Sequence, residues 1–300
     1  MIHGRHTPLT AFLVGMVGIA LFALMDALMK GLVLAIGTYA TLLWRSFAGV
    51  GIAGALFASN RPRWPVAATL RLHLVRGAVS TVMGVLFFWG LARVPLAQAI
   101  ALAFIAPLIA LILATAMLGE RVGARTVGAS ITAFLGVLII FFGQAQADLG
   151  RPALLGSLAI VVSAILYALN IVLMRRQSLA AGPSEVAFFQ NVTVSALLLC
   201  ALPFLGTSIP EAGQWPWLVV TAFLSTASLL LLSWAYARAE ASYLAATEYS
   251  SFLWAMLLGW LIFGETVSPY TLAGAALIVA GCIAAARSPA ECSPALEAAT

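Results

Sequence analysis

Three charged residues lie inside long apolar stretches of the chain: Asp26, Arg45 and Glu248. A charge in membrane hydrocarbon costs on the order of 3 kcal/mol, so each needs an opposite charge, a substrate or a proton as its partner. Asp26 stands four residues before Lys30 on the same helix face, which allows an ion pair or a coupling role. Glu248 has no basic residue three or four positions away. Its partner therefore comes from another helix, a substrate or a coupling proton, and we expect it to be functional.

Uncharged polar and aromatic residues in the same apolar stretches form a second set. A single Ser or Thr in a helix is usually bonded to its own backbone, so the collection is more informative than any one member. Together these groups offer hydrogen bonds and aromatic surface to a small ligand. The predicted binding residues are Ser80, Thr81, Trp89, Gln98, Tyr167, Asn170, Trp234, Glu248, Tyr249, Ser251 and Trp254. The residues predicted for ion pairing or coupling are Asp26, Lys30, Arg45 and Glu248.

The composition requires a lipid environment. Of the 300 residues, 63% are hydrophobic and 8% are charged, whereas a soluble domain carries about 25% charged residues. The net charge of +5 comes from arginines scattered at the ends of apolar runs, which indicates orientation in a membrane rather than nucleic-acid binding. The three cysteines and three isolated histidines have no metal-ligand spacing. We therefore expect a lipid bilayer and a small-molecule substrate as partners, with no metal, cofactor or nucleic acid.

Apolar runs of about 20 residues cross a membrane as helices. The chain has ten such runs, so we predict an all-α integral membrane protein with ten transmembrane helices. They cover 10–30, 38–59, 70–92, 96–118, 124–143, 154–174, 185–207, 215–237, 241–262 and 267–286. With the N-terminus inside, eleven arginines lie on the cytoplasmic side and only Lys30, Arg93 and Arg151 lie outside, so both termini are predicted to be cytoplasmic. The polar tail, 288–300, is predicted to be disordered.

The sequence is similar to itself after a shift of 145 residues. Without a gap, the alignment pairs Arg45 with Gln190, Ser80-Thr81 with Ser225-Thr226, Trp89 with Trp234, and Gly119-Glu120 with Gly264-Glu265. The halves, 1–150 and 151–287, each hold five predicted spans. Because five is odd, the two halves cross the membrane in opposite directions. The sequence therefore predicts two inverted five-helix repeats, which is an architecture of secondary transporters.

Two similar motifs lie at the turns after the fourth and ninth predicted spans. Glu120 and Glu265 each stand just before a helix, where a carboxylate accepts free backbone N–H groups and complements the helix dipole. The motifs run from Ala106-Pro107-Leu108-Ile109-Ala110 to Gly119-Glu120-Arg121-Val122, and from Trp254-Ala255 to Gly264-Glu265-Thr266-Val267. This pattern resembles that of the EamA family in the drug/metabolite transporter superfamily. One departure is Phe252, which stands where the first copy has Pro107.

The resemblance implies a central cavity that opens alternately to the two sides of a bacterial inner membrane. It also implies transport of small molecules, because members of the family export amino acids, drugs and metabolites or take up metabolites and nucleotide sugars. The exporters of aromatic amino acids look most similar. We therefore expect export of aromatic or neutral amino acids, by a protein that needs only one copy because a monomer holds both repeats. Aromatic residues would contact the substrate's side chain, while hydroxyl and amide groups would bind its ammonium and carboxylate. Glu248 would pair with the ammonium or carry a coupling proton.

Other functions fit the sequence less well. An exporter of organic cations, with Glu248 and Asp26 as counter-charges, is the alternative within the same superfamily. A membrane enzyme is disfavoured because the sequence has no metal-ligand cluster, no paired carboxylates at helical spacing and no phosphate-binding loop. A passive channel is disfavoured because no ring of charges and no filter-like loop is recognisable.

Overall fold

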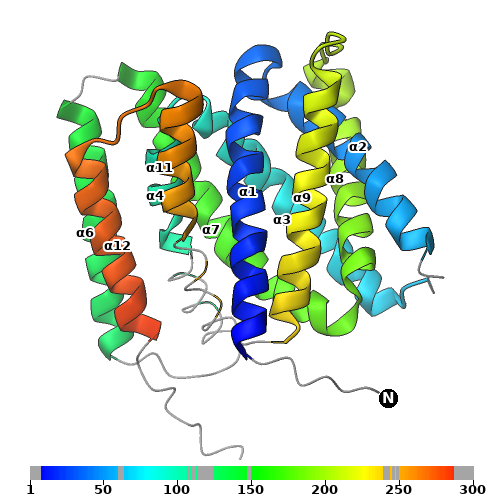
Figure 1. Cartoon of the computed structure of the whole chain (residues 1–300), viewed down its shortest axis with the longest axis horizontal. Coiled ribbons are helices and arrows are strands. Elements are labelled where there is room, and N and C mark those ends of the chain that lie inside the picture. The colour runs from blue at the N-terminus through cyan, green and yellow to red at the C-terminus, as the bar shows by residue number, and fades with distance from the viewer. Residues whose placement is uncertain are drawn as a thin grey trace, which may run out of the picture.

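The computed structural model describes residues 8–59, 64–106, 109, 113, 124–146, 150–238, 244, 247 and 250–286. Every regular element in these ranges is a helix, as predicted (Figure 1). The helices are α1 (Pro8–Ile36), α2 (Thr38–Ser59), α3 (Ala67–Leu91), α4 (Leu96–Ala103), α6 (Ala124–Gln146), α7 (Gly150–Ala180), α8 (Pro183–Leu205), α9 (Trp215–Tyr236), α11 (Ser250–Phe263) and α12 (Pro269–Ala286). Glu120, Glu248, Tyr249 and the tail 288–300 lie outside the described residues.

The outer surface of the helix bundle is apolar. Six helices are long and apolar enough to cross a membrane: α1, α2, α3, α7, α8 and α9. Large apolar side chains point outward from them, and Phe204 and Phe223, for example, are 88% and 59% exposed. Water penalises such a surface in proportion to its area, whereas lipid accepts it. The chain is therefore a multi-pass membrane protein.

Glycines in the left-handed region end two of the long helices. Gly37 has a φ of 83° and separates α1 from α2, and its N–H donates to the carbonyl of Val33 at 2.9 Å. Gly206 has a φ of 62° and follows α8, with its N–H donating to Leu202 at 2.9 Å. A residue with a Cβ is strained at such a φ, so glycine is the residue that usually occupies a positive-φ position at the C-terminal end of a helix.

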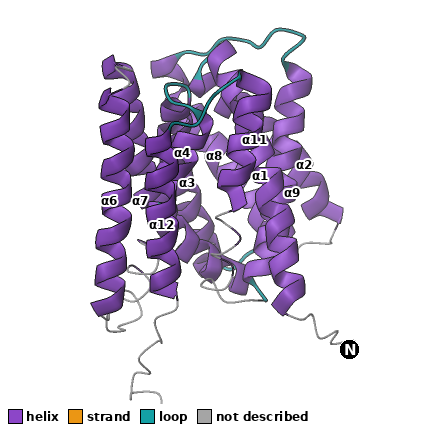
Figure 2. Cartoon of the chain, turned by 60° about the vertical axis from the view of Figure 1, so that its left-hand side comes forward, coloured by secondary structure: helices purple, strands orange, loops and turns teal. Residues whose placement is uncertain are grey.

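Helices that are far apart in the sequence make the main contacts. α1 packs against α9, α2 against α8, α3 against α7, and α6 against α12. The α6–α12 pair stands at one side of the bundle, while α2 lies at the other (Figures 1 and 2). Glycines allow two of these contacts to be close. A Cβ added to Gly90 would lie 2.5 Å from the carbonyl oxygen of Gly156, and one added to Gly136 would lie 2.5 Å from that of Gly274.

A buried ion pair joins four helices at the end of the bundle where α1 ends. Lys30 on α1 forms an ion pair with Glu265, which lies between α11 and α12, and donates to the carbonyl of Val94 at 2.7 Å. The other carboxylate oxygen of Glu265 accepts the backbone N–H of Leu96, the first residue of α4, at 2.7 Å. The expectation that Glu265 caps a helix is thus met at α4, and not at the helix that follows it in sequence. The spacing also allowed an ion pair of Lys30 with Asp26, but the described partner of Lys30 is Glu265.

Candidate functional site

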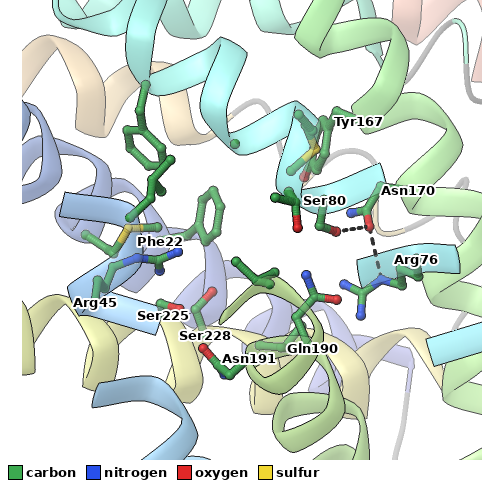
Figure 3. Close-up of a pocket in the computed structure, with 18 of the residues that line it drawn as sticks. Phe22, Arg45, Arg76, Ser80, Tyr167, Asn170, Gln190, Asn191, Ser225 and Ser228 are labelled. Carbon is green, nitrogen blue, oxygen red and sulfur yellow. Dashed lines mark hydrogen bonds between the residues drawn. The ribbon is translucent and has the colours of Figure 1, made fainter. Parts of the chain in front are cut away.

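A cavity of about 150 Å³ lies at the centre of the bundle, between α1, α2, α3, α7, α8 and α9. This is roughly the volume of a protein cavity that holds one benzene molecule. Aromatic surface comes from Phe22, Phe88 and Tyr167. The polar lining includes Arg45, Arg76, Ser80, Asn170, Gln190 and Ser228 (Figure 3). The site thus combines apolar surface with convergent hydrogen-bonding groups, as binding sites for small molecules do.

Arg76 is the most extensively bonded group of the cavity. It is 3% exposed, and its Nε donates to Asn170 Oδ1 at 3.0 Å. Its Nη1 donates to Gln177 Oε1 at 2.6 Å, and its Nη2 lies 3.6 Å from the sulfur of Met174. The Ser80 hydroxyl donates to the same Asn170 oxygen at 2.9 Å. All of these partners are neutral, so they fix the guanidinium in place without compensating its charge.

The polar contacts of Arg76 continue to the surface through His73. Arg76 can only donate, so the amide oxygen of Gln177 faces it and the amide nitrogen contacts His73 Nδ1. Nδ1 then accepts, and the ring proton sits on Nε2, which lies 3.0 Å from Glu185 at the start of α8. Phe189 stacks on the imidazole with ring centroids 4.7 Å apart. The sequence indicated isolated histidines, whereas His73 belongs to this network.

Arg45 lines the cavity from α2, and its Nε is buried without a hydrogen-bond partner among the described residues. The same holds for the Oε1 atom of Gln190, which lines the cavity from α8. Asp26 is 2% exposed on α1, and it does not lie within ion-pair distance of Arg45. The cavity therefore contains one unused donor on a cation and one unused amide acceptor.

The structure brings together four of the predicted binding residues. Ser80, Thr81, Tyr167 and Asn170 all line the central cavity. Gln98 is elsewhere: it is buried on α4 and donates to the Ser157 hydroxyl at 3.3 Å.

Two predicted tryptophans hold arginines instead of facing the central cavity. The guanidinium of Arg93 lies 3.6 Å from the ring centre of Trp89, and that of Arg238 lies 4.1 Å from that of Trp234. Each arginine also donates to the carbonyl of its tryptophan. Both are thus arginine–tryptophan pairs one helical turn apart, which is a geometry of cation–π stabilisation.

On α11, Ser251 is half-buried and Trp254 is 39% exposed on the outer surface. Neither lines the central cavity. Because Trp254 is partly exposed on an apolar helix and is absent from the cavity lining, its exposed surface is available to lipid rather than to a ligand in the central cavity.

A second, open cavity of about 800 Å³ lies between the ends of α1, α2, α3 and α8. It shares Thr81 and Leu198 with the central cavity. The Tyr39 hydroxyl donates to the carbonyl of Leu198 at 2.7 Å, so α2 and α8 are bonded together at this boundary. The open cavity leads from the end of the bundle where α1 ends toward the central site. It is also the cavity that Trp89 lines.

Sequence reasoning missed Arg76 and underrated Gln190 as cavity residues. Arg76 was counted among the arginines that orient the chain, although it precedes Ser80 by four residues and thus shares its helix face. Gln190 aligns with Arg45 in the repeat, which was the available signal.

A bundle of apolar helices around a central cavity with convergent hydrogen-bonding groups is typical of membrane transporters of small molecules. The chain belongs to the EamA-like transporter family, which matches residues 9–142 and 154–287. The resemblance read from the two Gly-Glu motifs is thereby confirmed, as is the prediction that the protein is a transporter and no enzyme.

Similar proteins include transporters of several kinds. A pseudopaline exporter of Pseudomonas aeruginosa is 27% identical over 72% of this chain and 74% of its own. A riboflavin transporter of Vibrio cholerae is 31% identical over 69% of this chain and 68% of its own. A probable terminal-alkyne amino-acid exporter of Streptantibioticus cattleyicolor is 30% identical over 73% and 74%. A solved crystal structure has the same fold, with a TM-score of 0.66, 20% identity and coverage of 96% of this chain and 100% of that chain.

Proposed function

We propose that this protein is a secondary transporter of a bacterial-type inner membrane that exports aromatic or neutral amino acids and similar small metabolites. The central cavity carries the proposal, because it places the aromatic rings of Phe22 and Tyr167 beside hydrogen-bonding groups from several helices. An amino acid needs both kinds of contact. Two relatives named as exporters, one of them a probable amino-acid exporter, support the direction and the substrate class.

Alternating access through two inverted repeats is the proposed mechanism. Residues 145 positions apart line the same cavity: Phe22 with Tyr167, Arg45 with Gln190, and Ser80 with Ser225. The helix contacts support the same relation. In the repeat, α7 is the counterpart of α1 and α9 is the counterpart of α3, and the contact of α1 with α9 therefore corresponds to the contact of α7 with α3. A site between two such halves can open to the cytoplasmic side in one conformation and to the outer side in the other, because the equivalent gates of the two repeats face opposite sides of the membrane. Ten helices with both termini in the cytoplasm remain the proposed topology.

An organic-cation exporter is the less favoured function. Two guanidinium groups line the central cavity, whereas no described carboxylate does. A cationic substrate would be repelled there, unless Glu248, outside the described residues, supplied a counter-charge. The proposed role of Glu248 in binding an ammonium or a coupling proton is therefore the point at which the two functions differ.

Flux measurements on the purified protein in liposomes test the proposed function. We expect saturable uptake of radiolabelled L-phenylalanine or L-leucine that excess unlabelled amino acid suppresses. A response to an imposed pH gradient that Glu248→Gln abolishes would support proton coupling. If no amino acid moved faster than into empty liposomes, while tetraphenylphosphonium did, the cation exporter would replace the amino-acid exporter.

A further inference from the structure

The described part of the central cavity carries more positive than negative charge. Arg45 and Arg76 both line it, and in Figure 3 they approach it from two sides. The described ion pairs are Lys30 with Glu265 and His73 with Glu185, so neither cavity arginine has a carboxylate of a described residue within 4.0 Å. Asp26, which is 2% exposed on α1, does not form an ion pair with Arg45. A buried cation without a close counter-charge is unfavourable in an apolar bundle, and an anionic ligand relieves this cost.

The two arginines are not equally available to a ligand. The nitrogens of Arg76 are engaged by Asn170, Gln177 and Met174, so this side chain is held in place and contributes mainly its charge. Arg45 keeps an unpartnered buried Nε at the cavity wall. A guanidinium presents its donors in a planar fork that matches a carboxylate. Arg45 is therefore the group at which an acid would bind directly.

Gln190 supplies the complementary function. Its Oε1 is buried, unpartnered among the described residues and part of the same cavity wall. An amide oxygen accepts an N–H group but cannot bind a carboxylate. Position 190 is also the repeat counterpart of position 45, so the two halves present an acceptor and a cationic donor at equivalent places. A ligand with both an acid and an N–H group would satisfy both orphaned atoms.

We infer that the central cavity selects molecules that carry a carboxylate, with Arg45 binding the carboxylate and Gln190 accepting an N–H group of the same molecule. This inference rests on the proposed function, because it takes the central cavity to be the substrate site. It narrows the substrate class to amino acids and related carboxylic acids with a free acid group, and it excludes amines without one.

Three probes of nearly equal size separate the contributions of the two groups. L-phenylalanine has both an acid and an amine, 3-phenylpropanoate has only the acid, and L-phenylalaninamide has lost the acid. Binding to the detergent-purified protein is measured by titration calorimetry, independently of transport. We expect L-phenylalanine to bind best and 3-phenylpropanoate to bind more weakly. The amide should bind at least about tenfold more weakly than L-phenylalanine, because it loses a hydrogen bond to a charged group.

Variants at position 45 assign the preference to one side chain. Arg45→Gln removes the charge, and it should abolish the difference between L-phenylalanine and its amide. Arg45→Lys keeps the charge without the planar fork, and it should retain part of the difference. Arg71→Gln removes an exposed arginine of α3 and is the matched control that should leave all affinities unchanged.

Gln190→Leu should bring L-phenylalanine to the affinity of 3-phenylpropanoate. Thermal denaturation identifies any variant that fails to fold, and Arg45→Lys then carries the test.

The outcomes separate this inference from the proposed function. If the wild type transported L-phenylalanine but the amide bound equally well, carboxylate selection would be overturned and the transport function would stand. If both acids bound and the amide did not, but no probe was transported, the inference would stand and the transport function would fall. Absence of binding by either acid, or an unchanged preference in Arg45→Gln, would also overturn the inference.

Discussion

Lys30 and Arg76 are cations buried among apolar helices, Arg45 is a partly buried one, and each is accommodated differently. Lys30 has a carboxylate partner in Glu265 and a carbonyl partner in Val94. Arg76 is surrounded by neutral acceptors, and Arg45 keeps a free donor at the cavity wall. The contact of Lys30 is structural and holds helix ends together, whereas Arg45 and Arg76 line the cavity that we propose as the ligand-binding site. Residue type alone does not reveal this difference, because the partners come from distant parts of the chain.

The contact between Lys30 and Glu265 should be strongly coupled energetically. Glu265→Gln leaves the buried ammonium of Lys30 without its counter-charge and should lower the free energy of unfolding by about 3 kcal/mol. Lys30→Met combined with Glu265→Gln removes both charges and should be less destabilised than Glu265→Gln alone. Denaturant unfolding of the two single variants and the double variant in detergent measures this coupling. Simple additivity of the two single effects would show that the pair contributes no stability.

The candidate site was only partly predictable from individual residues. Ser80, Thr81, Tyr167 and Asn170 were predicted as binding residues because polar groups inside apolar spans rarely face lipid, and they line one cavity; their role in binding stays a prediction. Arg76 was missed because an arginine near the end of a span fits the positive-inside rule equally well. Which face of a helix turns inward depends on the helices that pack around it, and local sequence does not contain that information.

At the scale of helices, six of the ten predicted spans are confirmed among the described residues, and the contacts between helices were predicted less well. Apolar runs and glycine turns define α1, α2, α3, α7, α8 and α9, since length and hydropathy determine which segments enter lipid. The cap that Glu265 provides was placed on the wrong helix. A carboxylate at a turn caps whichever free helix N-terminus packs beside it, and only the tertiary structure brings α4 to that place.

Close helix packing should depend on particular glycines rather than on glycine content. A Cβ at Gly136 on α6 would lie 2.5 Å from the Gly274 carbonyl oxygen on α12, so Gly136→Ala should destabilise the protein by about 1–3 kcal/mol. Gly128 lies on the same helix and has no described atom within 4 Å of an added Cβ. Gly128→Ala should therefore be neutral or slightly stabilising. Thermal denaturation of both variants compares them, and equal effects would contradict the packing described for α6 and α12.

At the scale of the whole molecule, the two halves of the chain are interleaved around one site. Each half contributes three of the six helices that line the central cavity: α1, α2 and α3 from the first, and α7, α8 and α9 from the second. The open cavity between α1, α2, α3 and α8 borders the same site, because Thr81 and Leu198 line both cavities. A substrate on this route would pass between the halves, so a relative movement of the halves would control its access.

The central claim is that the transported molecule passes through the central cavity, and filling that cavity tests it most directly. Gly84 lines it, and no described atom lies within 4 Å of an added Cβ there, so Gly84→Phe should occupy the cavity without disrupting the fold. Gly51 on α2 is exposed and equally unobstructed, which makes Gly51→Phe the matched control. The measurement is L-phenylalanine flux into liposomes that contain equal amounts of folded protein. Loss of flux in Gly84→Phe alone is the predicted result, and wild-type flux in Gly84→Phe would contradict the account.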